Sequence, residues 1–241
     1  PDTPTPRSPL TMRPPRSMTL GGDSTADGSA VLHRRLNQIL DRPHVPLLSD
    51  KSDIMTSDMV IALSAELPAR FRVSDWYLVY STWKHGFSIN TLYSKVEDYG
   101  PTIMAIRDAE KNVFGCFASE AWRLSNQYYG SGESFLFTFR STRSLEVFRW
   151  SHRNSFFQMG KADSLAMGGG DHFGLYVDAE LLDGSSGACE TFESQPLSNK
   201  VDFKVVSLEI WGFSSSKTHT ASLQAFRRAS ATRMHPYIAM K

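Results

Sequence analysis

Apolar and polar residues alternate differently in successive parts of the chain, and the change predicts helices followed by many short strands. Between Val60 and Leu67 apolar residues recur at helical spacing, so a helix is expected over residues 57–67, with Ser57 as its cap. Residues 76–81 are rich in aromatic and β-branched side chains and are too few for a helix, which indicates a strand.

Helical spacing returns from Ile89 to Val96, after the capping residue Ser88, and predicts a second helix. From Thr102 onward the pattern favours short strands broken by turn residues. These strands are expected at residues 103–106, 113–119, 135–140, 145–150, 156–159, 164–167, 173–177 and 203–213. The gaps between them are mostly too short for crossover connections, so antiparallel pairing follows. The predicted fold is α+β and mainly β, an antiparallel two-sheet β-sandwich flanked by one or two helices.

Composition divides the chain into three parts. The first aromatic residue is Phe71, and eight of the twelve prolines lie within residues 1–46. Such a segment buries too little apolar surface to offset its chain entropy, so residues 1–46 are expected to be a disordered arm. The folded domain is predicted over residues 47–213, followed by a partly ordered extension over residues 214–241.

Charge and cysteine content exclude several classes of protein. The formal net charge is +1 and no run of five like charges occurs, which argues against a nucleic-acid groove or a polybasic membrane patch. No apolar stretch approaches the length that spans a bilayer, so membrane insertion is not expected. Cys116 and Cys189 are the only cysteines and lack metal-ligand spacing. We therefore expect free thiols, no metal, and a monomeric intracellular protein.

Three consecutive glycines, Gly168, Gly169 and Gly170, separate two strand-like runs and are followed by Asp171 and His172. A glycine-rich loop that cradles phosphate requires a helix after it, so that amides and helix dipole point at the anion. The sequence that follows is instead typical of a strand. The glycines are therefore predicted to form a bulge or a tight connection between strands.

A few other residues could carry chemistry. Glu133 follows two glycines and is interpreted as a turn acid that accepts backbone amides, with a ligand or partner contact as the functional alternative. His85 and His172 lie beside glycine-containing turns and are expected to bond backbone carbonyls, although with Asp171 or Glu133 they could form a hydrolytic or metal site. Cys116 lies in a predicted core strand, and Cys189 beside an acidic neighbour, so neither favours thiolate chemistry. Trp83, in a predicted loop, is the tryptophan that packing explains least.

Read in order, these segments resemble the TLDc domain, the module of the oxidation-resistance protein family. The resemblance extends over roughly two thirds of the chain and is specific. It is carried by WYLVYST (76–82), KHGFS (84–88), TLY (91–93), VFG (113–115), YGSGESFLF (129–137), Trp150, Asn154, DSL (163–165), GGG (168–170), Asp178, Leu181, Gly184, Cys189, TF (191–192) and EIW (209–211).

The resemblance implies a non-enzymatic regulator that protects cells against oxidative stress. Several members of the family bind the vacuolar-type proton-pumping ATPase, so its peripheral subunits are the expected partners. No catalytic residues and no cofactors are implied. Ser185 stands where arginine is common in the family, which removes a surface cation and bears on any partner contact at that turn.

Two functional hypotheses follow. The first is an interaction module, cytoplasmic and recruited to the surface of acidic organelles, with mitochondrial and nuclear pools left open. The second is an antioxidant or hydrolytic enzyme that uses Glu133 with His85, His172 or a cysteine. A partner-binding surface is expected among Trp83, His85, Glu133, Gly168, Gly169, Gly170, Asp171, His172, Asp178 and Ser185.

Overall fold

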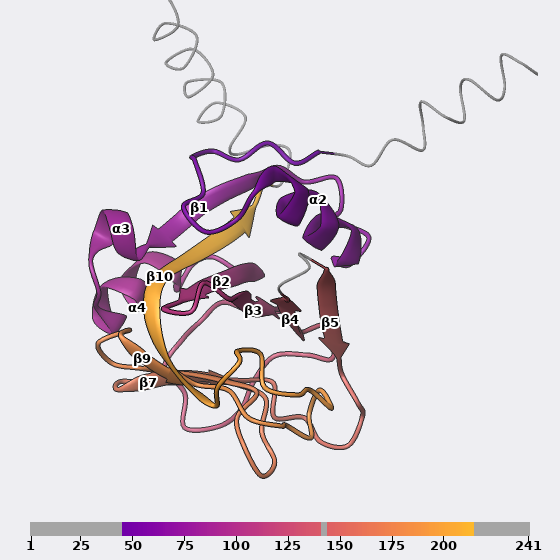
Figure 1. The fold of residues 1–241 in the computed structure, drawn as a ribbon, viewed down its shortest axis with the longest axis vertical. Helices are drawn as coiled ribbons and strands as arrows, with labels where there is room; N and C mark the ends of the chain where they lie inside the picture. The colour runs from indigo at the N-terminus through magenta and orange to yellow at the C-terminus, as the bar shows by residue number, and fades with distance from the viewer. Residues whose placement is uncertain (1–44, 141–143, 215–241) are drawn as a thin grey trace, which may run out of the picture. The chain divides into compact units, whose positions relative to one another are not determined.

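The computed structural model of the chain describes residues 45–140 and 144–214 (Figure 1). The predicted arm lies almost entirely outside the described residues, and so does the predicted C-terminal extension. The helices of the described part are α2 (Ser57–Glu66), α3 (Thr82–His85) and α4 (Ile89–Val96). The strands are β1 (Trp76–Ser81), β2 (Thr102–Asp108), β3 (Val113–Ala118), β4 (Phe135–Phe139), β5 (Leu145–Arg149), β6 (Gln158–Lys161), β7 (Ser164–Met167), β8 (Leu175–Asp178), β9 (Asp183–Ser185) and β10 (Asp202–Phe213).

All strands pair antiparallel, as predicted, and they form one ten-stranded sheet. Its order is β5-β4-β3-β2-β10-β9-β8-β7-β6, with β1 also paired to β10. The sequence predicted two separate sheets, whereas hydrogen bonds run continuously through β10. The reason is the length of this strand: twelve residues suffice to pair with β9 at one end and with β2 and β1 at the other.

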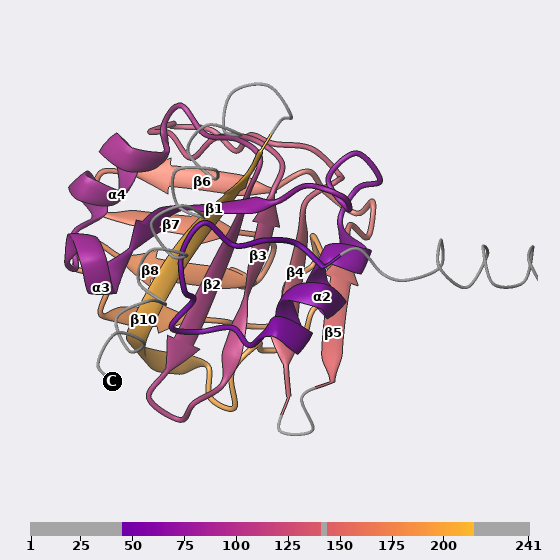
Figure 2. The same cartoon turned by 90° about the horizontal axis from the view of Figure 1, so that it is seen from above.

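Two buried clusters hold the sheet and its helices together. The larger one contains apolar side chains from both ends of the strand order, including Met104, Cys116, Leu136, Leu165, Met167 and Leu175. The second lies between the other face of β3 and β4 and helix α2, where Leu63 and Leu67 join Phe117 and Phe137. Figure 2 shows α2 over this part of the sheet. No helix of residues 45–140 and 144–214 is long and apolar enough to cross a membrane.

Several local predictions need correction. Helix α2 is capped by Thr56 rather than Ser57, while Ser88 caps α4 as expected. Trp83 lies in α3 and not in a loop. Strand β9 was not predicted, because three residues, one of them glycine, are too few to show the alternation of apolar and polar residues that marks a strand.

The chain enters and leaves the described region beside β1. The Trp76 amide donates to the Leu47 carbonyl at 2.9 Å, and the Ser49 amide donates to the Trp76 carbonyl at 2.8 Å. At the other end, the Ser214 amide donates to the Asp75 carbonyl at 2.9 Å. Both ends are thus attached to the same short segment.

A buried carboxylate fastens residues 47–55, which we call the N-terminal strap, to the middle of the sheet. Glu209 of β10 is almost fully buried. One of its oxygens accepts from the Ser52 hydroxyl at 2.6 Å and from the Trp211 indole at 3.0 Å, and the other accepts from the Asp53 amide at 2.6 Å. These donors give the carboxylate the partners that a buried charge requires.

We expect Glu209→Ala to lower the free energy of unfolding by about 3 kcal/mol, because three donors in a buried site lose their acceptor. Urea unfolding of the purified variant measures this. Glu146→Ala is the control, since that carboxylate is exposed and paired with Arg140 at the surface, where a salt bridge contributes about 0.5 kcal/mol. Equal losses in the two variants would contradict the role of Glu209.

Candidate functional site

The glycine run opens the connection between β7 and β8, residues 168–174, which we call the glycine turn. The predicted connection between strands is confirmed, although with seven residues it is longer than the tight connection expected. Gly168 and Gly170 have φ values of 78° and 117°, a region that side chains with a Cβ rarely adopt. A Cβ on Gly168 would lie 2.7 Å from the sulfur of Cys189, so the close approach of this side chain also requires glycine. The turn therefore depends on glycine for both conformation and space.

The backbone of this turn is engaged by the protein itself. The Gly168 amide donates to the Phe157 carbonyl at 2.9 Å, and the Gly169 amide donates to the Thr191 hydroxyl at 2.9 Å. The Gly169 carbonyl accepts from the Glu190 amide at 3.1 Å. Strand β8, not a helix, follows the turn. The first two glycine amides are thus unavailable to a phosphate group, and no helix dipole points at the turn.

Two surface pockets lie near the glycine turn, and Asp171 lines both. One, of about 320 Å³, is lined by Gly169, Gly170, His172 and Ser185 together with Tyr128. The other, also about 320 Å³, is lined by Arg153, Cys189, Glu190 and Glu193. Five of the residues that the sequence singled out therefore share one pocket.

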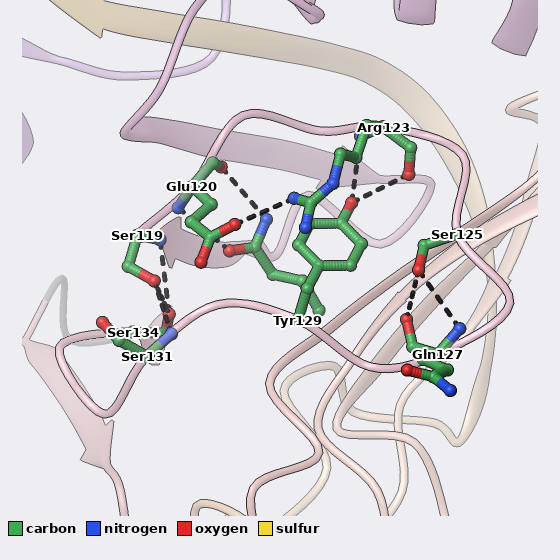
Figure 3. A network of polar contacts seen from close by, with 9 residues as sticks. Ser119, Glu120, Arg123, Ser125, Gln127, Tyr129, Ser131 and Ser134 are labelled. Atoms are coloured by element: carbon green, nitrogen blue, oxygen red, sulfur yellow. Dashed lines mark hydrogen bonds and ion pairs between the residues drawn. The ribbon is translucent and has the colours of Figure 1, made fainter.

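Sequence reasoning missed a polar network around Tyr129, the residue that follows Tyr128 of the first pocket (Figure 3). The Tyr129 hydroxyl accepts from the Arg123 amide and donates to the Arg123 carbonyl, each at 3.0 Å. The Arg123 guanidinium lies 3.9 Å from the centre of the Tyr129 ring and pairs with Glu120 at 2.8 Å. The adjacent Tyr128 ring stacks on Phe156 with centroids 4.6 Å apart. Tyr128 itself lines the first pocket.

Glu133 lies on the exposed surface, where both of its oxygens pair with the guanidinium of Arg70. The Arg70 hydrogen bonds hold the pKa of Glu133 below its ordinary value. The expected role, a turn acid accepting backbone amides, is therefore replaced by an ion pair. Sixty-three residues separate the two partners, so no local pattern could reveal the pairing.

His85 lies at the end of α3, and its Nδ1 accepts from the Ser81 amide at 3.1 Å. The sequence predicted a bond to a backbone carbonyl, which the structure replaces by a bond from a backbone amide. Partial burial lowers the pKa of His85, and the nearby charges of Lys95 and Lys84 lower it further. The ring is therefore neutral at pH 7, and its Nδ1 is the acceptor.

Asp178 closes the turn after β8, since its Oδ1 accepts from the Leu182 amide at 3.0 Å and the Asp183 amide at 3.2 Å. Such an arrangement is a structural cap for a tight turn. Asp178 thus belongs to the turn that precedes β9, while Ser185, within β9, belongs to the pocket of the glycine turn.

The groups proposed for an enzyme are not assembled at one place. Glu133 is bound to Arg70, His85 to Ser81, and His172 lines the pocket of the glycine turn. Cys116 and Cys189 are free thiols and both are buried. Complete burial raises the pKa of Cys116, which keeps it protonated. The described residues contain no group of three or more His, Cys, Asp or Glu placed to hold a metal ion.

Comparison with known proteins gives a consistent result. Residues 48–214 match the family model described as the TLDc domain. Oxidation resistance protein 1 of Bos taurus and of Homo sapiens are each 44% identical over 170 residues, which is 70% of this chain and 19% of each relative. Nuclear receptor coactivator 7 of Homo sapiens is 41% identical over 175 residues, 72% of this chain and 18% of that protein. The chain thus matches about a fifth of the length of these relatives.

Substitution at the glycine turn should damage the fold. We expect Gly168→Ala to lower the free energy of unfolding by about 1–3 kcal/mol, because alanine is strained at the positive φ of this position. The contact with Cys189 should add to that cost. Gly86→Ala is the matched control, because Gly86 has a φ of 80° with open space around it. Urea unfolding of both variants separates the effect of the positive φ, which both share, from the effect of the close contact with Cys189, which only Gly168→Ala makes. An equal loss in the two would mean that the contact with Cys189 contributes nothing.

The stability of the protein should depend on the protonation of His85. In the unfolded chain this histidine titrates near 6.5, whereas its pKa in the folded chain is lower. Below pH 6.5 the unfolded state therefore binds more protons, so stability falls as the pH falls. We expect His85→Gln to lose less unfolding free energy than the wild type between pH 7.5 and pH 5.5. Parallel pH profiles in denaturant titrations would refute this.

Proposed function

Because this chain belongs to the TLDc domain family, we propose that it is a non-enzymatic interaction module of oxidative-stress resistance that binds the vacuolar-type proton-pumping ATPase. Its partners in this proposal are the peripheral subunits of the pump. It acts in the cytoplasm and is recruited to the surface of acidic organelles. The family resemblance supports the identity of the partner. The arrangement of the reactive groups supports a non-enzymatic role.

The observation that carries the proposal is that most of the reactive groups are engaged separately in structural interactions. Glu133 pairs with Arg70, His85 and Asp178 accept backbone amides, and both thiols are buried. Catalysis by a nucleophile and a base requires the two groups within hydrogen-bond reach of each other. The dispersal of these groups is typical of a folded module whose surface carries the function. The alternative, an antioxidant or hydrolytic enzyme, has no comparable support.

Co-purification tests the proposal directly. The tagged full chain, incubated with purified pump, should retain the peripheral subunits after washing at physiological salt. A matched sample of Gly168→Val, in which the positive φ and the contact with Cys189 are incompatible with a branched side chain, should retain much less. Failure of the folded wild-type chain to retain any pump subunit would overturn the proposed partner.

Protection against oxidants should not depend on thiol chemistry. We expect the double variant Cys116→Ala and Cys189→Ala to protect cells against peroxide as well as the wild type at equal abundance, because both thiols are buried. Loss of each buried thiol should lower the free energy of unfolding by about 1 kcal/mol. Survival assays are made alongside a measurement of pump binding. Lost protection with unchanged pump binding would instead favour the enzyme.

A further inference from the structure

Four aromatic side chains line a surface pocket at the end of β10 that the proposed function does not use. The pocket has a volume of about 390 Å³, which lies within the range of sites for small ligands. Its aromatic lining residues, which are all partly buried, are Phe71, Tyr77, Tyr99 and Phe213. We call it the aromatic pocket. Partly buried rings in its wall leave some of their surface open to a ligand.

Two of these rings form a concave corner. Tyr77 and Tyr99 meet edge to face, with ring centroids 5.5 Å apart and an angle of 62° between their planes. Phe71 and Phe213 are instead stacked, with centroids 4.9 Å apart. Inclined aromatic rings that share a corner are the arrangement with which proteins surround alkylated ammonium groups.

The sequence holds the corner in place without a ligand. Tyr77 of β1 lies opposite Gly212 of β10, and a Cβ at residue 212 would come within 2.5 Å of the Tyr77 ring. Glycine therefore leaves the space that this ring occupies. Tyr99 follows α4, and its amide donates to the Val96 carbonyl at 2.9 Å. Both tyrosines are thus positioned by the fold itself.

The charge of the aromatic pocket favours a cation. Of the described residues, only Arg70 and Asp98 bring a formal charge to its lining. The guanidinium of Arg70 pairs with both oxygens of Glu133, which balances its charge. The Asp98 carboxylate forms no hydrogen bond or ion pair within residues 45–140 and 144–214. A free carboxylate beside aromatic rings attracts a cation more strongly than a neutral or anionic group.

The stability of α4 does not explain Asp98, which lies two residues after the last residue of that helix. The C-terminus of a helix carries a partial negative charge, so a carboxylate near it is unfavourable and a cation is favourable. The helix end and Asp98 therefore act in the same direction on an ion in the pocket. Arg70 shows that a ring of this pocket accepts a cation, since its guanidinium carbon lies 4.6 Å from the centre of the Phe71 ring.

We propose that the aromatic pocket binds a trimethylammonium group, with Tyr77 and Tyr99 against its methyl groups and Asp98 as its counter-charge. A primary ammonium ion has three N–H donors that need acceptors, whereas a trimethylammonium group has none and is attracted by aromatic faces. Four aromatic residues and one free carboxylate suit the second kind of ion. Choline and the side chain of trimethylated lysine both carry this group. The site does not depend on the proposed function.

Calorimetric titration of the purified 241-residue chain tests the ligand class. Choline is compared with 3,3-dimethylbutanol, its neutral carbon isostere, and with ethanolamine, which lacks the methyl groups. We expect choline to bind at least about tenfold more tightly than either, because it alone combines the charge with the methyl groups. A peptide with one trimethyllysine, set against the unmodified peptide, distinguishes the two sources of the group: the tighter of choline and the modified peptide identifies the source.

Substitutions separate the contribution of the rings from that of the charge. Tyr99→Ala should weaken choline binding at least about tenfold, whereas Tyr99→Phe keeps the ring and should bind nearly as well as the wild type. Asp98→Asn should weaken binding about fivefold, and most strongly at low salt. Glu97→Gln is the matched control, because this neighbouring carboxylate is exposed and does not line the aromatic pocket. Circular dichroism verifies that each variant is folded.

Binding that Tyr99→Ala and Asp98→Asn weaken and Glu97→Gln leaves unchanged would support the site. Equal affinity for choline and either comparison compound, or no binding of choline and the modified peptide, would overturn it. Lys217 is the first cation in the sequence after Ser214, which lines the pocket. If choline binds only to the Lys217→Ala variant, the occupant is this lysine of the chain itself and the proposal is wrong. None of these measurements involves the pump, so their failure leaves the proposed function untouched.

Discussion

The backbone hydrogen bonds of β10 join two sets of strands, and the arrangement of every other element depends on them. On one side of the strand order lie β2 to β5, and on the other β9 to β6. The same strand carries Glu209, whose carboxylate fastens the N-terminal strap, and Leu208, whose amide binds α3 through Thr82. Disruption of β10 would therefore release the strap and α3 and would separate the two sets of strands.

Much of the fold could be predicted from local pattern, because burial imposes a period on the sequence. Residues 203–213 were recognised as a strand, and the helix after Ser88 was placed correctly. The continuity of the sheet could not be predicted, since the pattern of one strand does not say which strands lie at its two edges. Strand β9 was missed for the related reason that its partners, rather than its three residues, define it.

The candidate site likewise contains features that the local sequence predicts and features that it does not. The glycine turn was predicted as a strand connection, because glycine content and the strand that follows are local properties. The pairing of Glu133 with Arg70 depends on a contact between segments distant in sequence, which no local pattern predicts. Glu133, His85 and Asp178 make structural interactions, whereas Asp171, His172 and Ser185 line a pocket.

The two ends of the described region bind the same segment, through Leu47 at Trp76 and Ser214 at Asp75. Because the two ends of the described region lie at neighbouring points, a force that pulls on both of them acts at one place on the domain. Tension along the chain would load β1 and the end of β10 first and would leave the glycine turn unstressed. Residues added before or after the domain would therefore lengthen the connecting chain without changing the structure of the domain.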